Sequence, residues 1–269
     1  MPTLPPTATT GSLAGLYYDL QGPVKAETLV SLHGFSLRGD VFDRMLGGLN
    51  GSLQLLTPDL RGCGRSDRLT GPYTTEQHVT DLAQLLDWLD IPRVHLLGYS
   101  YGGAIAQQFA KQYPDRVEKL VLVCSWAFKP QTYSEILEYY FGPTAYRILG
   151  SRQVAQRLTP RMVEAMGLVA DDAWVEWYRG VLQAYREEVL LAGAEAVFQF
   201  DSRRWLRQIE APTLVVGGAE DSIVPPYHAR MLAQGIPGAE LWLLPGEGHA
   251  LPYRQALTLA ERVKQFVAS

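Results

Sequence analysis

The sequence lacks several features that would point to particular classes of protein. It has only two cysteines in 269 residues, Cys63 and Cys124, which is too few for a disulfide scaffold. We expect both to be free thiols in a reducing compartment. No apolar run approaches the roughly 18 residues that cross a membrane. The 24 basic and 28 acidic residues are interspersed and leave a net charge of −4, so neither nucleic acid nor a membrane surface is predicted as a partner.

Signals for targeting and for cofactors are missing as well. The first ten residues, MPTLPPTATT, have neither the basic nor the apolar segment of a signal peptide. We expect them to form a frayed end, and we expect the protein to be soluble and cytoplasmic. Histidine and cysteine do not recur at metal-ligand spacing, and the glycines at 98–103 lack the lysine of a phosphate-binding loop. No metal and no organic cofactor is therefore predicted.

The sequence does contain a regular alternation of short apolar runs and amphipathic stretches. This alternation is typical of an α/β fold, here a mostly parallel, doubly wound sheet with helices on both faces. The predicted strands are 16–20, 27–34, 53–60, 93–98, 117–125, 211–218 and 239–246. The predicted helices are 40–49, 75–90, 101–113, 225–235 and 253–267.

The alternation stops between residues 129 and 205, where only helical patterns occur. We therefore predict one core built from residues 1–128 and 206–269, with residues 129–205 inserted as a helical cap. This segment is rich in aromatic residues. Large side chains are what a small helical unit needs for its own core, but some of them could equally line an apolar substrate pocket.

Residues 98–103 read Gly-Tyr-Ser-Tyr-Gly-Gly and lie between an apolar run and a helical pattern. The pattern G-x-S-x-G in a strand–turn–helix setting places a serine on a strained corner, with its hydroxyl above the edge of the sheet. The flanking glycines remove side chains that would collide there. Ser100 is thus a candidate nucleophile, and it needs a base and a group that orients the base.

Among the five histidines, His249 has the best position for the base, because it lies in a glycine-rich loop between the last strand and the last helix. Two acidic residues, Glu220 and Asp221, directly follow the strand at 211–218. Asp221 is the preferred orienting acid, with Glu220 as its local competitor. The chain order is then serine, acid, histidine.

Acyl transfer also requires donors for a developing oxyanion. The backbone N–H of Tyr101, directly after the candidate nucleophile, and that of Phe35, after an earlier strand, fit this role. His33 is then interpreted as a structural residue.

These segments together resemble the α/β-hydrolase family, in its esterase and enol-lactonase branch. The matching segments are HGF at 33–35, DLRGCGRSD at 59–67, GYSYGG at 98–103, GAEDSIVPP at 218–226 and GEGHALP at 246–252. The resemblance implies Ser100 as nucleophile, Asp221 as acid, His249 as base, and Phe35 and Tyr101 as oxyanion donors. It also implies substrate contacts at Trp126 and Val224, and structural roles for Asp59, Arg61 and Ser66. One departure is that no Glu-x-Pro follows the histidine, which should affect helix packing.

The leading hypothesis is a serine hydrolase that acts on small, largely apolar esters or lactones. Relatives with the same motifs resemble cofactor-free haloperoxidases (perhydrolases) and C–C bond hydrolases, and the motifs do not separate these reactions. A ligand receptor on this fold is a third reading. A serine at position 100, where some relatives carry aspartate, argues against epoxide hydrolases and haloalkane dehalogenases.

Overall fold

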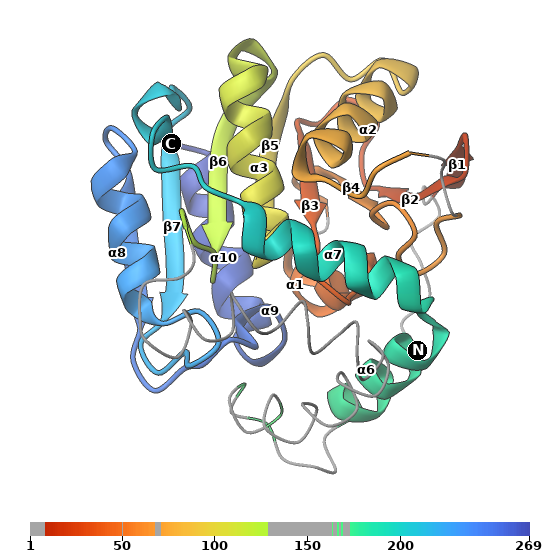
Figure 1. Cartoon of the computed structure of the whole chain (residues 1–269). Helices are drawn as coiled ribbons and strands as arrows, with labels where there is room; N and C mark the ends of the chain where they lie inside the picture. Colours follow the sequence, from red (N-terminus) through yellow and green to blue (C-terminus); the bar gives the residue numbers. More distant parts are fainter. Residues whose placement is uncertain are drawn as a thin grey trace.

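An eight-stranded β-sheet with helices on both faces organises the protein (Figure 1). The computed structural model describes residues 9–49, 51–67, 71–128, 163, 166, 168 and 173–269. The strand order is β1-β2-β4-β3-β5-β6-β7-β8; β1 and β2 are antiparallel to their neighbours, and the remaining pairs are parallel. The predicted fold class is confirmed. The strands span Thr9–Leu13 (β1), Leu16–Gln21 (β2), Thr28–Leu32 (β3), Gln54–Pro58 (β4), Val94–Tyr99 (β5), Val117–Val123 (β6), Thr213–Gly218 (β7) and Glu240–Leu244 (β8).

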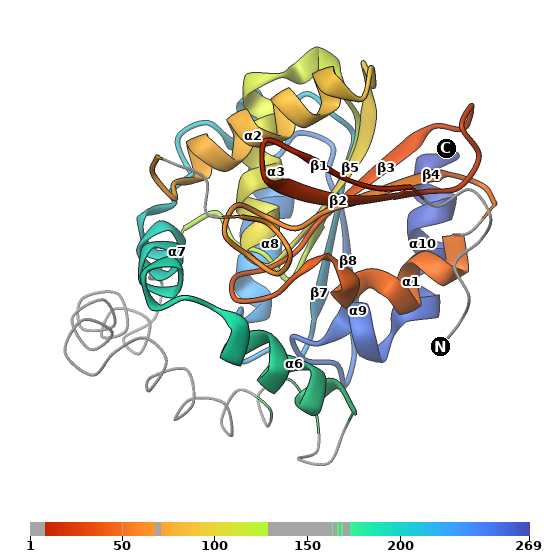
Figure 2. The same ribbon diagram turned by 90° about the vertical axis from the view of Figure 1, so that its right-hand side faces the viewer.

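The helices divide between the two faces of the sheet (Figure 2). One face is covered by α1 (Asp43–Leu49), α9 (Leu251–Arg254) and α10 (Ala256–Val267), and the other by α2 (Thr75–Trp88), α3 (Tyr101–Gln112) and α8 (Pro226–Gly235). Short 3-10 turns span Gly39–Phe42, Pro114–Arg116 and Leu206–Gln208. The sequence predicted one continuous helix over 253–267, which was wrong. The chain leaves helical geometry at Gln255, with φ −112° and ψ 31°, so α9 and α10 are separate.

The central strands bury both faces, which is why they read as continuous apolar runs. In β5, Leu96 packs into the core on the α3 side and Leu97 into the core on the α10 side. In β6, Leu122 and Val123 divide in the same way. Successive side chains of a strand point to opposite faces, so one apolar run supplies two cores.

The amino-terminal strand β1 was not expected from the sequence. Thr9 and Thr10, which were predicted to belong to a frayed end, pair with Leu20 and Asp19 of β2. The two strands are joined by Ala14 and Gly15, both with positive φ (47° and 89°), as in a tight two-residue hairpin. The residues of β1 are mostly small, polar and exposed, so the strand has no apolar pattern that the sequence could show. Its hydrogen bonds to β2 hold it in place.

Two helices of the inserted segment lie beside the carboxyl ends of the strands (Figure 1). These are α6 (Ala173–Ala184) and α7 (Glu187–Gln199). Their inner faces contribute to both cores, with Tyr178 of α6 on one side and Val189 of α7 on the other. The helical patterns predicted between residues 129 and 160 lie outside the described residues, and the assignment of 129–205 as a separate cap stays a prediction.

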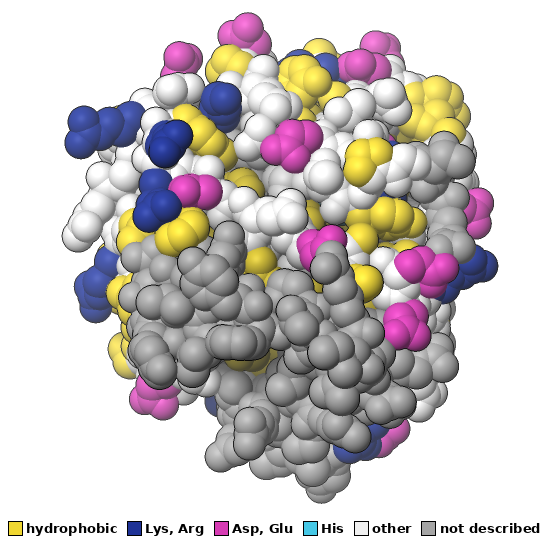
Figure 3. All heavy atoms as spheres, in the orientation of Figure 1, with side chains coloured by type: hydrophobic (Ala, Val, Ile, Leu, Met, Phe, Trp, Pro, Cys, Tyr) yellow, Lys and Arg dark blue, Asp and Glu magenta, His cyan; other side chains and the backbone are white. Residues whose placement is uncertain are grey.

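The described part of the surface carries both signs of charge, and the face in Figure 3 displays acidic and basic side chains together. Within that described part, no helix is both long enough and apolar enough to cross a membrane.

Candidate active site

Ser100 occupies the sharp corner between β5 and α3. Its φ of 54° and ψ of −119° lie in a region that side-chain-bearing residues rarely adopt. The corner is held by a hydrogen bond from the Ser100 N–H to the Val123 carbonyl, at 2.8 Å, and by the start of α3 directly after it. Strain of this kind persists only where the surroundings impose it, and it clusters at functional sites.

Glycines surround this corner because other backbone segments approach it closely. A Cβ at Gly98 would lie 2.3 Å from the Gly102 carbonyl oxygen, and one at Gly102 would lie 2.1 Å from the Leu32 carbonyl oxygen. A Cβ at Gly103 would lie 2.4 Å from the Ser125 hydroxyl. Real Cβ atoms essentially never approach other atoms this closely, so side chains are excluded at all three positions.

His249 lies within hydrogen-bond distance of Ser100, with its Nε2 3.1 Å from the Ser100 Oγ. The histidine belongs to the loop between β8 and α9 and is 3% exposed. Its loop is held in place by Tyr99, whose hydroxyl donates to the His249 carbonyl at 3.0 Å and whose ring lies against the imidazole. Tyr99 therefore positions the histidine loop, a role that the sequence did not indicate.

Asp221 completes a hydrogen-bonded chain with His249. Its Oδ2 lies 2.7 Å from His249 Nδ1. Its Oδ1 accepts from the backbone N–H groups of Ile223 and Val224, at 2.9 and 2.8 Å, which fixes the carboxylate. The competing acid Glu220 is exposed, whereas Asp221 is buried. Of the two adjacent acids, Asp221 is the one that contacts the imidazole.

The loop after β3 passes close to Ser100. A Cβ at Gly34 would lie 3.1 Å from the Ser100 Cβ. Phe35 is the next residue in the chain after this close approach. His33 is fully buried, and burial lowers its pKa. A neutral ring fits its two contacts, in which Nε2 accepts from the Leu60 N–H at 2.9 Å and Nδ1 donates to the Gly34 carbonyl at 2.8 Å. His33 is therefore a structural residue, as expected.

Tyr101 begins α3, where the first backbone N–H groups have no acceptor within the helix. Its side chain is 2% exposed; its hydroxyl lies 3.3 Å from the Thr75 hydroxyl, and its ring packs edge-on against His78. The tyrosine ring is thus part of the core, and the assignment of the Tyr101 backbone N–H as an oxyanion donor stays a prediction.

The two residues predicted to contact substrate both lie near this edge of the sheet. Trp126 follows β6, is 2% exposed, and its carbonyl accepts from the Gln107 side chain at 3.0 Å. Val224 is 4% exposed and is held through its N–H to Asp221. Their contact with substrate stays a prediction.

The loop at 59–67 has the structural role that was expected. Asp59 is fully buried and accepts hydrogen bonds from the Gly39 N–H at 2.7 Å and from both the N–H and the side chain of Arg65 at 2.8 Å. Burial by itself would raise the pKa of Asp59, but the hydrogen bonds from Arg65 outweigh it, and the pKa is lowered. Nearby, Arg61 forms a buried ion pair with Asp81, with a shortest distance of 2.6 Å.

Both cysteines are free, as expected, and both are buried. Burial raises the pKa of Cys63 to about 12 and that of Cys124 well above its usual range. Such thiols are poor nucleophiles. Cys124 nevertheless lies near Asp221 and His249, a neighbourhood that no sequence signal indicated.

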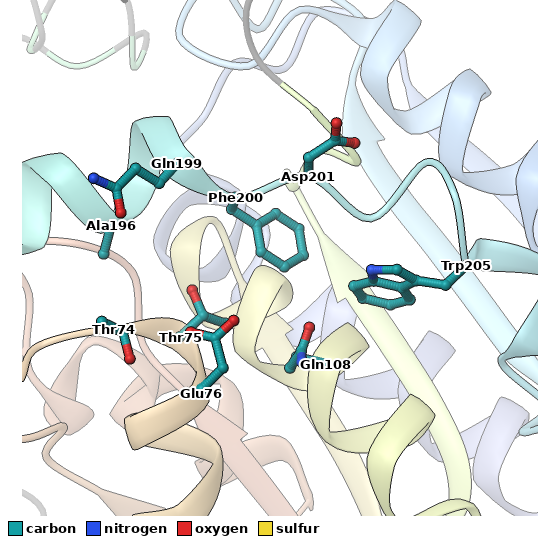
Figure 4. Close-up of a pocket in the computed structure, with 9 residues that line it drawn as sticks. All are labelled: Thr74, Thr75, Glu76, Gln108, Ala196, Gln199, Phe200, Asp201 and Trp205. Carbon is teal, nitrogen blue, oxygen red and sulfur yellow. The ribbon is translucent and has the colours of Figure 1, made fainter.

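A pocket of about 280 Å³ lies where α2, α3 and the end of α7 approach one another (Figure 4). Its walls come from the start of α2, the middle of α3, the end of α7 and the segment that follows α7. Lining residues include Thr75, Gln108, Phe200 and Trp205. Ser100, His249 and Asp221 are not among its lining residues, so it is separate from the candidate active site.

Comparison with known proteins agrees with this architecture. A family model described as the alpha/beta hydrolase fold matches residues 27–254. A protein named "Putative carbamate hydrolase RutD" from Variovorax paradoxus (strain S110) is 28% identical, over 94% of this chain and 96% of its own. A poly(3-hydroxyalkanoate) depolymerase from Ectopseudomonas oleovorans is 27% identical, over 89% of this chain and 83% of its own.

Among solved structures, the enol-lactonase from Burkholderia xenovorans LB400 has a TM-score of 0.84 and 25% identity, over 97% of this chain and all of its own (100%). Because the family model spans most of the sequence, the chain belongs to the α/β-hydrolase fold family, and it is a hydrolase.

Proposed function

We propose that this hydrolase cleaves small, largely apolar carboxylic esters or lactones through an acyl-enzyme intermediate. The observation that carries the proposal is the hydrogen-bonded chain Ser100–His249–Asp221, with steps of 3.1 and 2.7 Å, which begins at a serine on a strained corner. A nucleophile, a base and a group that orients the base are the parts that acyl transfer requires.

In the proposed reaction, His249 Nε2 takes the proton of Ser100 as Oγ attacks the carbonyl carbon. The carbonyl oxygen becomes an oxyanion, which the backbone N–H groups of Phe35 and Tyr101 stabilise. His249 then gives its proton to the leaving alcohol, and the acyl-enzyme forms. Water, activated by the same histidine, releases the acid. Asp221 stays ionised, holds the Nδ1–H tautomer and stabilises the imidazolium.

The substrate class is supported by the relatives. The enol-lactonase and the depolymerase are both named for the cleavage of ester-type bonds. A carbamate is a second candidate, favoured by the name of the 28% identical relative. A carbamate carbonyl would use the same attacking and orienting groups, so the two substrates differ in what the pocket accepts.

The mechanism is tested with Ser100→Ala and a p-nitrophenyl ester of a short-chain acid. The variant should retain less than about a thousandth of the wild-type kcat, because only binding and oxyanion stabilisation remain. A fluorophosphonate probe should label the wild type at Ser100 and leave the variant unlabelled. Full activity in the variant would refute the mechanism. A panel of esters, lactones and carbamates, ranked by kcat/KM, then decides between the substrate classes.

A further inference from the structure

Three buried side chains with different chemistry meet at the carboxyl ends of three neighbouring strands. Cys124 follows β6, Asp221 follows β7 and His249 follows β8. Their ligand atoms all lie within 4.8 Å of one another, and their exposed fractions are 2%, 2% and 3%. Asp221 Oδ2 lies at Nδ1 of the imidazole, opposite the Nε2 atom that faces Ser100, and the Cys124 thiol lies in hydrogen-bond contact with the Asp221 side chain.

We propose that Cys124, Asp221 and His249 form a binding site for a thiophilic divalent cation such as Zn²⁺ or Cd²⁺, and that its occupation switches the enzyme off. The inhibitory consequence rests on the proposed function, because it acts on the base of that mechanism. The binding of the ion does not depend on it.

The chemistry of the three groups suits such an ion. Thiolate, imidazole and carboxylate are the three side-chain ligands that Zn²⁺ takes in proteins. A thiolate and a carboxylate together cancel the two positive charges, so the occupied site is neutral, which a buried site favours. Asp221 is already oriented, because its Oδ1 is held by two backbone N–H groups and only Oδ2 is directed at the imidazole.

The metal ion would compete with the hydrogen bond between His249 and Asp221. With bonds of about 2.0–2.3 Å, two ligands of a tetrahedral zinc ion lie roughly 3.5 Å apart. The Nδ1 and Oδ2 atoms are now 2.7 Å apart, so they must separate slightly to admit the ion. Occupation therefore breaks the contact between His249 and Asp221.

The proton balance explains why the enzyme would stop. Cys124 loses its thiol proton to solvent, and the ion takes the lone pair of His249 Nδ1. The single ring proton must then lie on Nε2, since a neutral metal-bound imidazole carries it on the other nitrogen. Nε2 becomes a donor and can no longer accept the proton of Ser100.

The binding is tested by titrating the full-length protein with Cd²⁺ and recording the ultraviolet charge-transfer band of a cadmium thiolate. Cys63 provides the matched control, because it is the other cysteine and is also buried. The wild type and C63S should show a saturable band, and C124S should show none. His249→Ala removes a ligand and should weaken the affinity for Cd²⁺ by at least about 100-fold, since the loss of a group that only orients a ligand already costs about 10–100-fold. No band in the wild type, or an equal band in C124S, would overturn the proposal.

The switch is tested by Zn²⁺ inhibition of p-nitrophenyl ester hydrolysis, with each protein normalised to its own rate without metal. The Zn²⁺ concentration that halves the rate should be unchanged in C63S and should rise at least about tenfold in both C124S and C124A. Equal inhibition of the wild type and both Cys124 variants would place the ion elsewhere and overturn the switch. A cadmium band in a protein that hydrolyses none of the substrates would support the metal site and refute the proposed function alone.

Discussion

The hydroxyl of Tyr178 in α6 lies 3.0 Å from the hydroxyl of Ser36, in the loop that follows β3. Both side chains are buried, and Ser36 has a φ of 57°, in the left-handed region. A second tyrosine, Tyr185, donates to the Leu37 carbonyl at 2.5 Å. Two tyrosines of the inserted segment therefore hold the residues directly after Phe35, one of the two proposed oxyanion donors.

Tyr178→Phe should lower kcat/KM for an ester by about tenfold, mainly through kcat. Without the phenolic hydroxyl, Ser36 loses its buried partner and the Phe35 N–H can move from its position, which weakens oxyanion stabilisation. The free energy of unfolding should fall by about 1 kcal/mol. Steady-state kinetics and urea unfolding measure the two effects.

Tyr113→Phe is the control for this change, because Tyr113 lies at the end of α3 and packs against Phe109 away from the loop. A boronic acid, which mimics the tetrahedral intermediate, should bind Tyr178→Phe about tenfold more weakly, in parallel with kcat/KM. Unchanged boronic acid affinity together with lower stability would show that Tyr178 has only a structural role.

Asp221→Asn and Glu220→Gln separate the two adjacent acids. Asp221→Asn should lower kcat by about 10⁴-fold, because an amide at this position favours the wrong histidine tautomer and cannot stabilise the imidazolium. Glu220→Gln changes an exposed side chain and should leave kcat within about twofold of the wild type. Ester kinetics at saturating substrate measure both, and comparable losses in the two variants would contradict the assignment of Asp221.

Gly102→Ala and Gly47→Ala test the close packing at the corner. A Cβ at Gly102 would meet the Leu32 carbonyl oxygen at 2.1 Å, so the free energy of unfolding should fall by about 3 kcal/mol or more. Gly47 lies on the exposed side of α1 with nothing within 4 Å, and alanine there should raise stability by about 0.5–1 kcal/mol. Urea unfolding measures whether Gly102→Ala lowers and Gly47→Ala raises the free energy of unfolding. Equal stability of the two variants would contradict the close approach at Gly102.

The stability of the protein should fall in acid partly through Asp59. Its pKa is lower in the folded state than in the unfolded chain, where it is about 3.9. The ionised Asp59 therefore adds to the free energy of unfolding above about pH 3.9, and this stabilisation is lost as the pH falls through the pKa of the folded state. Asp59→Asn should cost about 3 kcal/mol near pH 7 and progressively less below about pH 4. Unfolding curves at several pH values measure this, and a cost that does not depend on pH would be evidence against it.

Much of the fold could be predicted because burial leaves a direct trace in the sequence. The central strands are covered on both faces and appear as short apolar runs, and helices such as α2 show one apolar face. The strand β1 and the division between α9 and α10 left no such trace. Pairing with β2 determines the first, and local backbone geometry at Gln255 determines the second.

The sequence by itself determined which chemical groups are present and in what order they follow the strands. A glycine-flanked Ser100, an acid after β7 and a histidine after β8 are local features, because each depends on only a few neighbouring residues. Parallel strands carry such loops to one edge of the sheet, so their meeting could also be expected.

Only the tertiary structure decided the contacts between side chains that are far apart in the chain. Asp221 rather than its neighbour Glu220 reaches His249, Tyr178 reaches Ser36 across 142 positions, and Cys124 comes close to both Asp221 and His249. The sequence already favoured Asp221 over Glu220, but no periodicity or motif encodes the contacts of Tyr178 and Cys124. These contacts follow from how the strands and helices pack. If the chain left a strand one residue earlier or later, a different side chain would face the partner.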